Sequence, residues 1–157
     1  MINILEEIKQ LMKKTPLPYG RNPVLMDYRD DGYFQKIAIL CNPRSIISIH
    51  MHRVGAQMDC YVYEDDRWVS YQLGYILYLR IPKGKKIIER PPDLDTLSLD
   101  ARRLFGVKAT YNLLIQYGDD VLKGEMEWTK ETKYPPLKIS DFAIAEIYGA
   151  FARQCND

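Results

Sequence analysis

The sequence predicts a single α+β domain: a mainly antiparallel sheet of short hairpins, an N-terminal amphipathic helix, a short middle helix and a buried C-terminal helix. The length of 157 residues is about that of one domain. Turn dipeptides at close intervals between residues 24 and 90 require antiparallel neighbours. Apolar residues follow helical spacing at both ends of the chain, and neither a repeat nor a Gly/Ser linker divides it.

Residues 2–14 are predicted to form the first helix. Its apolar residues share one face, namely Ile4, Leu5, Ile8, Leu11 and Met12. Glutamates lie toward its start and lysines toward its end, which suits the helix dipole. Residues 15–23 contain three prolines and are expected to form an extended tether to the sheet.

Residues 24–90 are expected to be rich in β-strand, because apolar and aromatic segments alternate there with turn residues. The expected turns are Asp31-Gly32, Asn42-Pro43-Arg44, Asp65-Asp66 and Pro82-Lys83-Gly84. The expected strands are Val24–Asp30, Tyr33–Cys41, Ser45–Val54, Met58–Glu64, Arg67–Ile81 and Lys85–Arg90. Asp-Gly suits a two-residue hairpin turn because Gly tolerates a positive φ.

Residues 97–105 are predicted to form a short helix that stops at Gly106, where a left-handed cap is expected. Residues 107–128 are predicted to form a hairpin, because residues 107–117 alternate between apolar and polar side chains. A helix over residues 104–117 also fits the spacing of Leu104, Val107, Tyr111 and Leu114. The strand is preferred because Gly106 then lies at a boundary.

Residues 140–154 are predicted to form the closing helix after a polar loop over residues 129–139. Ser140 is the expected N-cap, and Asp141 lies in the first turn. Apolar side chains lie on every face of this helix, and Glu146 is the main exception. We therefore expect the helix to be buried on every face. It would lie under the sheet or pack against another subunit.

Composition and charge exclude several classes of protein. The formal net charge of +1 indicates neither a strongly basic nucleic-acid binder nor an acidic mimic. Cys41, Cys60 and Cys155 are an odd number without CxxC spacing, which favours reduced thiols in a cytoplasmic protein. No secretory signal and no membrane partner are expected, since the most apolar C-terminal stretch is too short to span a bilayer.

The concentration of aromatic residues is the strongest candidate for a binding surface. The chain contains 12 tyrosines, and six aromatic residues crowd two predicted adjacent strands: Tyr61, Tyr63, Trp68, Tyr71, Tyr75 and Tyr78. If Met58, Cys60 and Val62 face the core, Tyr61 and Tyr63 point outward as part of an exposed aromatic strip. Aromatic pairing that merely stabilises the sheet is the competing interpretation.

His50 and His52 are the only histidines and are expected to share one face of a strand. With Arg53 beside them, they could act as the acid and base of a phosphodiester transfer or as metal ligands. An HxH pair without a third histidine is a weak metal motif, so no metal site is predicted. Polar residues on the exposed face of a half-buried strand are the competing interpretation.

The segment from Arg80 to Lys108 carries an excess of basic residues. Phosphate contacts are assigned, under a nucleic-acid hypothesis only, to Lys83, Lys85, Lys86, Arg90, Arg102 and Arg103. The Lys-rich turn lacks the pattern of a nucleotide-binding loop. A solvated hairpin that protects a sheet edge explains these lysines equally simply.

Three functional hypotheses follow from these patterns. The first is a non-enzymatic interaction protein that binds a protein partner or itself through the aromatic sheet surface, the C-terminal helix or both. The alternative is a nucleic-acid-binding or phosphodiester-cleaving protein, and only this alternative calls for a cofactor, a divalent metal. The third is a small-molecule-binding domain with a tyrosine-lined pocket. A compact domain of this kind is compatible with an accessory protein of a phage or virus.

Overall fold

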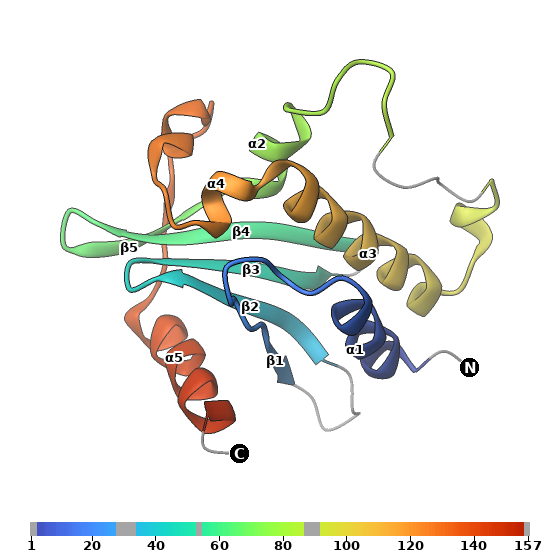
Figure 1. The fold of residues 1–157 in the computed structure, drawn as a ribbon, viewed down its shortest axis with the longest axis horizontal. Coiled ribbons are helices and arrows are strands. Elements are labelled where there is room, and N and C mark those ends of the chain that lie inside the picture. The colour runs from blue at the N-terminus through green and yellow to red at the C-terminus, as the bar shows by residue number, and fades with distance from the viewer. Residues whose placement is uncertain (1–2, 28–33, 53–54, 87–91, 156–157) are drawn as a thin grey trace.

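The computed structural model describes residues 3–27, 34–52, 55–86 and 92–155, and these form a six-stranded sheet with helices on both faces (Figure 1). The strands are β1 (Val24–Asp27), β2 (Phe34–Asn42), β3 (Ser45–His52), β4 (Gly55–Glu64), β5 (Arg67–Tyr71) and β6 (Leu137–Lys138). The α-helices are α1 (Ile4–Lys14), α2 (Leu73–Tyr78), α3 (Leu99–Tyr117), α4 (Asp119–Leu122) and α5 (Asp141–Cys155). Two 3₁₀ turns are η1 (Leu94–Thr96) and η2 (Glu127–Glu131). The predicted α+β class with an antiparallel sheet is therefore confirmed.

The strands lie in the sheet in the order of the sequence, and every neighbouring pair is antiparallel. The predicted turns at residues 42–44 and 65–66 join β2 to β3 and β4 to β5. Asp65 and Asp66 both adopt positive φ, 50° and 60°, which matches the twist of a two-residue hairpin. Asp31-Gly32 lies outside the described residues.

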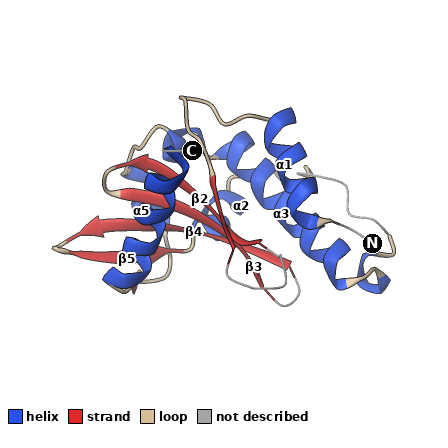
Figure 2. Cartoon of the chain, turned by 90° about the horizontal axis from the view of Figure 1, so that it is seen from below, coloured by secondary structure: helices blue, strands red, loops and turns tan. Residues whose placement is uncertain are grey.

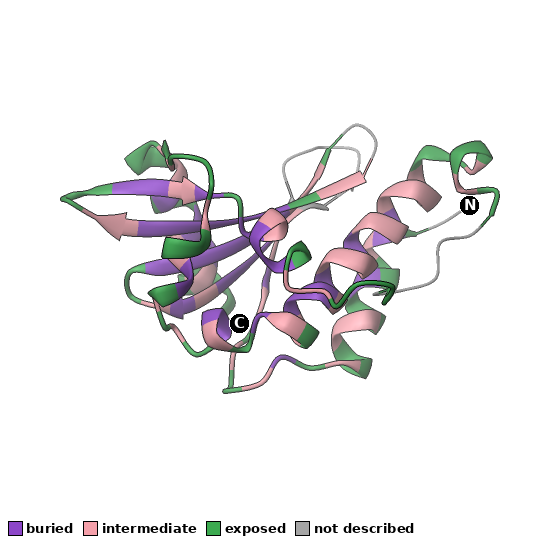
Figure 3. Ribbon diagram, turned by 90° about the horizontal axis from the view of Figure 1, so that it is seen from above, coloured by how far each residue is buried: buried purple, intermediate pink, exposed green. Residues whose placement is uncertain are grey.

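Each face of the sheet has its own apolar core, because side chains alternate between faces along a strand. Ile37, Ile47 and Met58 belong to the core beneath α1 and α3. Ile46 and Tyr61 belong to a second core, which α5 covers from the opposite face (Figure 2). The buried residues concentrate on the central strands and on the inner side of α3 (Figure 3).

The predicted strand over residues 67–81 is wrong beyond Tyr71. The chain leaves the sheet at this point and forms α2 over Leu73–Tyr78. Leu73, Ile76 and Leu77 are buried with i, i+3 and i+4 spacing, which is the pattern of a helix face. The turn after α2 forms, since Lys85 N–H donates to Pro82 O at 3.0 Å. Lys85 and Lys86 are not in a strand, and the rest of that predicted strand lies outside the described residues.

The predicted helix over residues 97–105 and hairpin over 107–128 are also wrong, because one long helix, α3, continues through Gly106 to Tyr117. Its buried face contains Leu104, Val107, Tyr111 and Leu114, the helical spacing that competed with the strand. Gly106 is not a cap: a Cβ there would lie 2.8 Å from the backbone N of Ala56 on β4. Close packing of helix on strand therefore requires this glycine.

The C-terminal helix forms as predicted, with Ser140 Oγ accepting from Ala143 N–H at 3.2 Å. It is not buried on every face. Ile144 and Ile147 face the sheet, whereas Phe142 is 74% exposed. The loop before it is interrupted by η2 and by β6, which adds a short edge to the sheet beside β5.

Candidate functional site

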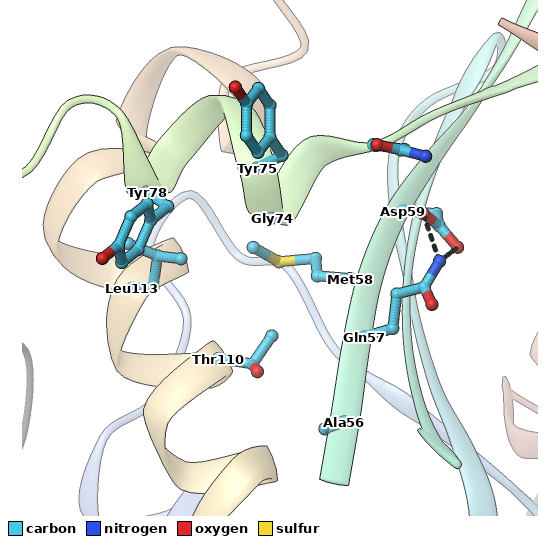
Figure 4. A pocket seen from close by; sticks show the side chains of 10 residues that line it. Ala56, Gln57, Met58, Asp59, Gly74, Tyr75, Tyr78, Thr110 and Leu113 are labelled. Carbon is cyan, nitrogen blue, oxygen red and sulfur yellow. Dashed lines mark hydrogen bonds between the residues drawn. The ribbon is translucent and has the colours of Figure 1, made fainter. Parts of the chain in front are cut away.

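An open cavity of about 440 Å³ lies where β4 passes α2 and α3, and we call it the β4–α2 groove (Figure 4). Strand β4 contributes Ala56, Gln57, Met58 and Asp59; α2 and the residue before it contribute Gln72, Gly74, Tyr75 and Tyr78; α3 contributes Thr110 and Leu113. A volume of this size is in the range of ligand-binding clefts. The groove is therefore the candidate binding site of the described residues.

The groove exists because β5 is shorter than β4. Their pairing begins at Cys60, opposite Tyr71, and continues to the Asp65-Asp66 turn. Beyond Tyr71 the chain turns into α2, which packs closely on β4: a Cβ on Gly74 would lie 3.4 Å from Met58 O. On the side away from β3, the part of β4 before Cys60 consequently has the groove beside it, and no other described strand pairs with it there.

Two tyrosines of α2 shape the wall of the groove. In Figure 4 the ring of Tyr78 is drawn beside Leu113 of α3, and Thr110 follows lower on α3, whereas the ring of Tyr75 projects from α2 on the side away from both. Tyr75 also contacts Tyr134, with 5.6 Å between ring centroids. Tyr78 is 65% exposed. Tyrosine combines a large contact area with a polar tip, so this wall suits a partner that is partly apolar.

The predicted exposed aromatic strip is not found on the sheet itself. Tyr61 and Trp68 are buried beneath α5, where Trp68 contacts Tyr63 and Tyr148. Tyr71 points to the opposite face and packs edge-on against Trp128. The expectation failed because both faces of the sheet are covered. Only the two tyrosines of α2 line the groove, and a binding role for the six aromatic residues stays a prediction.

His50 lies in a polar cluster on the α5 face of the sheet. Its Nδ1 is 3.9 Å from Oδ2 of Asp59, which lies on the neighbouring strand. Gln57 Nε2 donates to both carboxylate oxygens of Asp59, at 3.2 and 3.1 Å. Lys36 Nζ lies 3.5 Å from the hydroxyl of Tyr61. The register of β2, β3 and β4 brings these residues together, since Lys36, His50 and Gln57 are direct cross-strand partners.

Burial dominates the electrostatics of this cluster. It lowers the pKa of His50 despite the opposing effect of Asp59, and it raises the pKa of Asp59 despite the hydrogen bonds from Gln57. Ser48 shares this face but is completely buried, so a substrate cannot reach its hydroxyl. Among the described residues, the cluster thus offers no accessible nucleophile beside the imidazole.

The residues assigned to phosphate contacts are spread over two elements. Lys83, Lys85 and Lys86 are exposed on the segment after α2. Arg102 and Arg103 lie on α3, where Arg103 Nε donates to the backbone O of His52 at 3.1 Å. The structure therefore brings one predicted basic residue to the end of the histidine strand. Arg53 and Arg90 lie outside the described residues.

Metal ligands do not gather in the part of the chain that the structure describes. No group of three or more histidine, cysteine, aspartate or glutamate side chains there could hold a metal ion. Cys41 and Cys60 are buried free thiols. Burial raises the pKa of the Cys41 thiol to about 12, which makes it a poor nucleophile.

Comparisons with protein-family models, with curated proteins and with solved structures found no match to this chain. None of the described helices combines the length and the apolar character that crossing a membrane requires. The function is therefore argued from the geometry of the site.

Sequence reasoning named Tyr75 and Tyr78 but missed the other walls of the groove. Met58 and Leu113 were assigned to strands, and Gly74 to the middle of one. The helical spacing of Leu73, Ile76 and Leu77 was the signal that could have placed α2. The groove itself depends on where β5 ends, and no short sequence pattern marks that position.

Proposed function

We propose that this protein is a non-enzymatic binding protein and that its partner, a protein segment, binds in the β4–α2 groove. The observation that carries this proposal is the solvent-exposed Tyr78 beside Tyr75 on the wall of an open cavity. Exposed aromatic side chains next to a concave surface are the residues that most often dominate binding energy. Among the described residues that line the groove, Asp59 is the one charged side chain and none is Lys or Arg, which favours a protein segment over a phosphate backbone.

A peptide-selection experiment tests this proposal. Random linear peptides of about twelve residues, displayed on phage, would be selected against the full chain and then measured as synthetic peptides. Replacing Tyr78 with Ser should weaken binding about 30-fold, the value for a loss of about 2 kcal/mol at a hot spot. Phe142→Ser is the matched control, because it removes an aromatic ring of similar exposure from α5 and should leave binding unchanged.

Other results would contradict the proposal or move the site. If no peptide is enriched, the proposal fails. If Phe142→Ser abolishes binding and Tyr78→Ser does not, the binding surface is on α5, the other surface that the sequence suggested. Fluorescence anisotropy with labelled RNA and DNA at low ionic strength tests the nucleic-acid alternative, whose phosphate contacts should be strongest there. Light scattering of both variants tests self-association.

A further inference from the structure

We infer that the partner segment carries a basic side chain, a lysine or an arginine, and that Asp59 of the β4–α2 groove binds its cationic group. This inference rests on the proposed function and deepens it, because it specifies the chemistry of the partner. It makes Asp59 the residue that determines which segments bind, whereas Tyr78 supplies contact area.

Asp59 holds the charge of the groove in a nearly buried position. The residue lines the cavity but is only 6% exposed. Figure 4 shows Asp59 and Gln57 on one side of β4, with Met58 and Tyr78 on the other. None of the described residues in the lining is Lys or Arg, so the groove itself does not repel a basic segment. Little water screens such a carboxylate, which therefore attracts a cation more strongly than an exposed one does.

The carboxylate of Asp59 has neutral groups as its closest partners among the described residues. Gln57 Nε2 donates to its two oxygens at 3.2 and 3.1 Å. His50 Nδ1 lies 3.9 Å from Oδ2, but it is buried without a hydrogen bond, and burial lowers the pKa of His50. The imidazole is therefore mainly neutral at pH 7. Lys36 acts on Asp59 from beyond ion-pairing distance, and its Nζ lies 3.5 Å from the hydroxyl of Tyr61.

This arrangement costs stability in the free protein. An ionised carboxylate that is buried against neutral groups destabilises the fold that contains it. Burial accordingly raises the pKa of Asp59 despite the hydrogen bonds from Gln57. A perturbed charge that lines a cavity is a feature of functional sites. A cation from the partner would provide the countercharge, so binding would relieve the cost that the free protein carries.

A long basic side chain can reach Asp59 at the position that Gln57 occupies. Gln57 is exposed, so its amide can swing away from the carboxylate without leaving a cavity in the core. Its bonds to both oxygens use the positions that a guanidinium or an ammonium group would take. The apolar stem of the lysine or arginine can lie against the lining at Tyr75 and Tyr78. Aromatic rings also attract cations, which adds to the effect of the carboxylate.

A double-mutant cycle tests the inference. A peptide that phage selection enriches on the full chain would be synthesised with each of its lysines and arginines replaced in turn by glutamine. Asp59→Asn and one of these replacements should each weaken binding about tenfold or more, the value for losing a hydrogen bond between charged groups. Both changes together should weaken it little further, because they remove the same ion pair. Glu146→Gln is the matched control, since it removes a negative charge from the exposed surface of α5 and should leave affinity unchanged.

The pH dependence of affinity is a readout that a merely structural role of Asp59 would not move. Binding of the basic peptide should strengthen as the pH rises through the pKa of Asp59, because the carboxylate then becomes charged. Among the described residues, the other titratable groups on this face are His50 on β3, Lys36 on β2 and Tyr61 on β4. Protonation of His50 would weaken binding in the same direction. Asp59→Asn keeps these three groups, so the difference between the two pH profiles belongs to Asp59.

The results separate this inference from the proposed function. Enriched peptides without a basic residue overturn the inference, and so does a cycle in which the two losses simply add. An Asp59→Asn variant that binds as tightly as Glu146→Gln overturns it as well. If Tyr78→Ser still weakens binding in any of these cases, the proposed function stands. Enrichment of no peptide defeats both.

Discussion

Gly106 offers the sharpest test of how α3 is positioned on the sheet. In an isolated helix, replacing a central glycine with alanine stabilises the helix by about 1 kcal/mol. In this protein the added Cβ would lie 2.8 Å from Ala56 N and 3.2 Å from Gly55 C. Both atoms belong to the backbone of β4 and cannot rotate away. We therefore expect Gly106→Ala to destabilise the folded protein.

The expected size follows from two opposing terms. Overpacking of a close-packed interior costs about 1–3 kcal/mol, which exceeds the gain of about 1 kcal/mol in helix propensity. A net loss of about 1–2 kcal/mol in the free energy of unfolding is the result. Gly149→Ala on α5 is the matched control, since its Cβ would meet only the flexible Arg153 side chain, at 3.3 Å. That variant should gain about 0.5–1 kcal/mol.

Urea unfolding followed by circular dichroism measures both variants. The midpoint should fall for Gly106→Ala and rise for Gly149→Ala at an unchanged slope, which shows that stability rather than compactness changed. If Gly106→Ala raises the midpoint as Gly149→Ala does, then α3 does not lie against β4 as described. The groove would lose its α3 wall with it.

Three further results are expected. Burial raises the pKa of Asp59 in the folded protein, so the protein loses stability as the pH rises from the pKa of the unfolded state through that of the folded state. Asp59→Asn removes this charge, so it should raise the urea midpoint at pH 7 but not near pH 3. Ile147→Ala should lower the free energy of unfolding by about 2–5 kcal/mol, because it opens a cavity beneath α5. Phe142→Ala should change it by less than about 0.5 kcal/mol, and urea unfolding measures both variants. Iodoacetamide should leave Cys41 and Cys60 unlabelled in the native protein and label both in urea, as measured by mass spectrometry.

The elements predicted correctly are those whose signals are local. The first helix has an uninterrupted apolar face, and the Asp65-Asp66 turn carries its own backbone preference. The errors fall where packing overrides a local preference. Gly106 costs α3 about 1 kcal/mol, yet the close approach to β4 requires it. A local sequence pattern around Gly106 contains no information about β4, because β4 is distant in the sequence and meets Gly106 only in the folded protein.

The candidate site was predicted in part for the same reason. Tyr75 and Tyr78 were named from their residue type, which does not depend on the fold. Met58 and Leu113 were not named, because their roles depend on where β5 ends and on how α3 crosses β4. His50 and Asp59 meet because of the register between β3 and β4, and that register depends on the fold as a whole rather than on a local sequence pattern.

The order of strands in the sheet has a consequence for how the chain folds. Strands β1 to β5 pair between neighbours in the chain, whereas β6 must bring Lys138 to Val69 before α5 can cover its face. Closing such a long loop costs conformational entropy, so we expect the meander to form first and α5 to dock last. Native-state hydrogen exchange should then show α5 opening at a lower free energy than β3. Tyr61 and Trp68 would reach solvent only in that partly opened state, because α5 covers them in the native fold. They would then form an exposed aromatic surface that is prone to association.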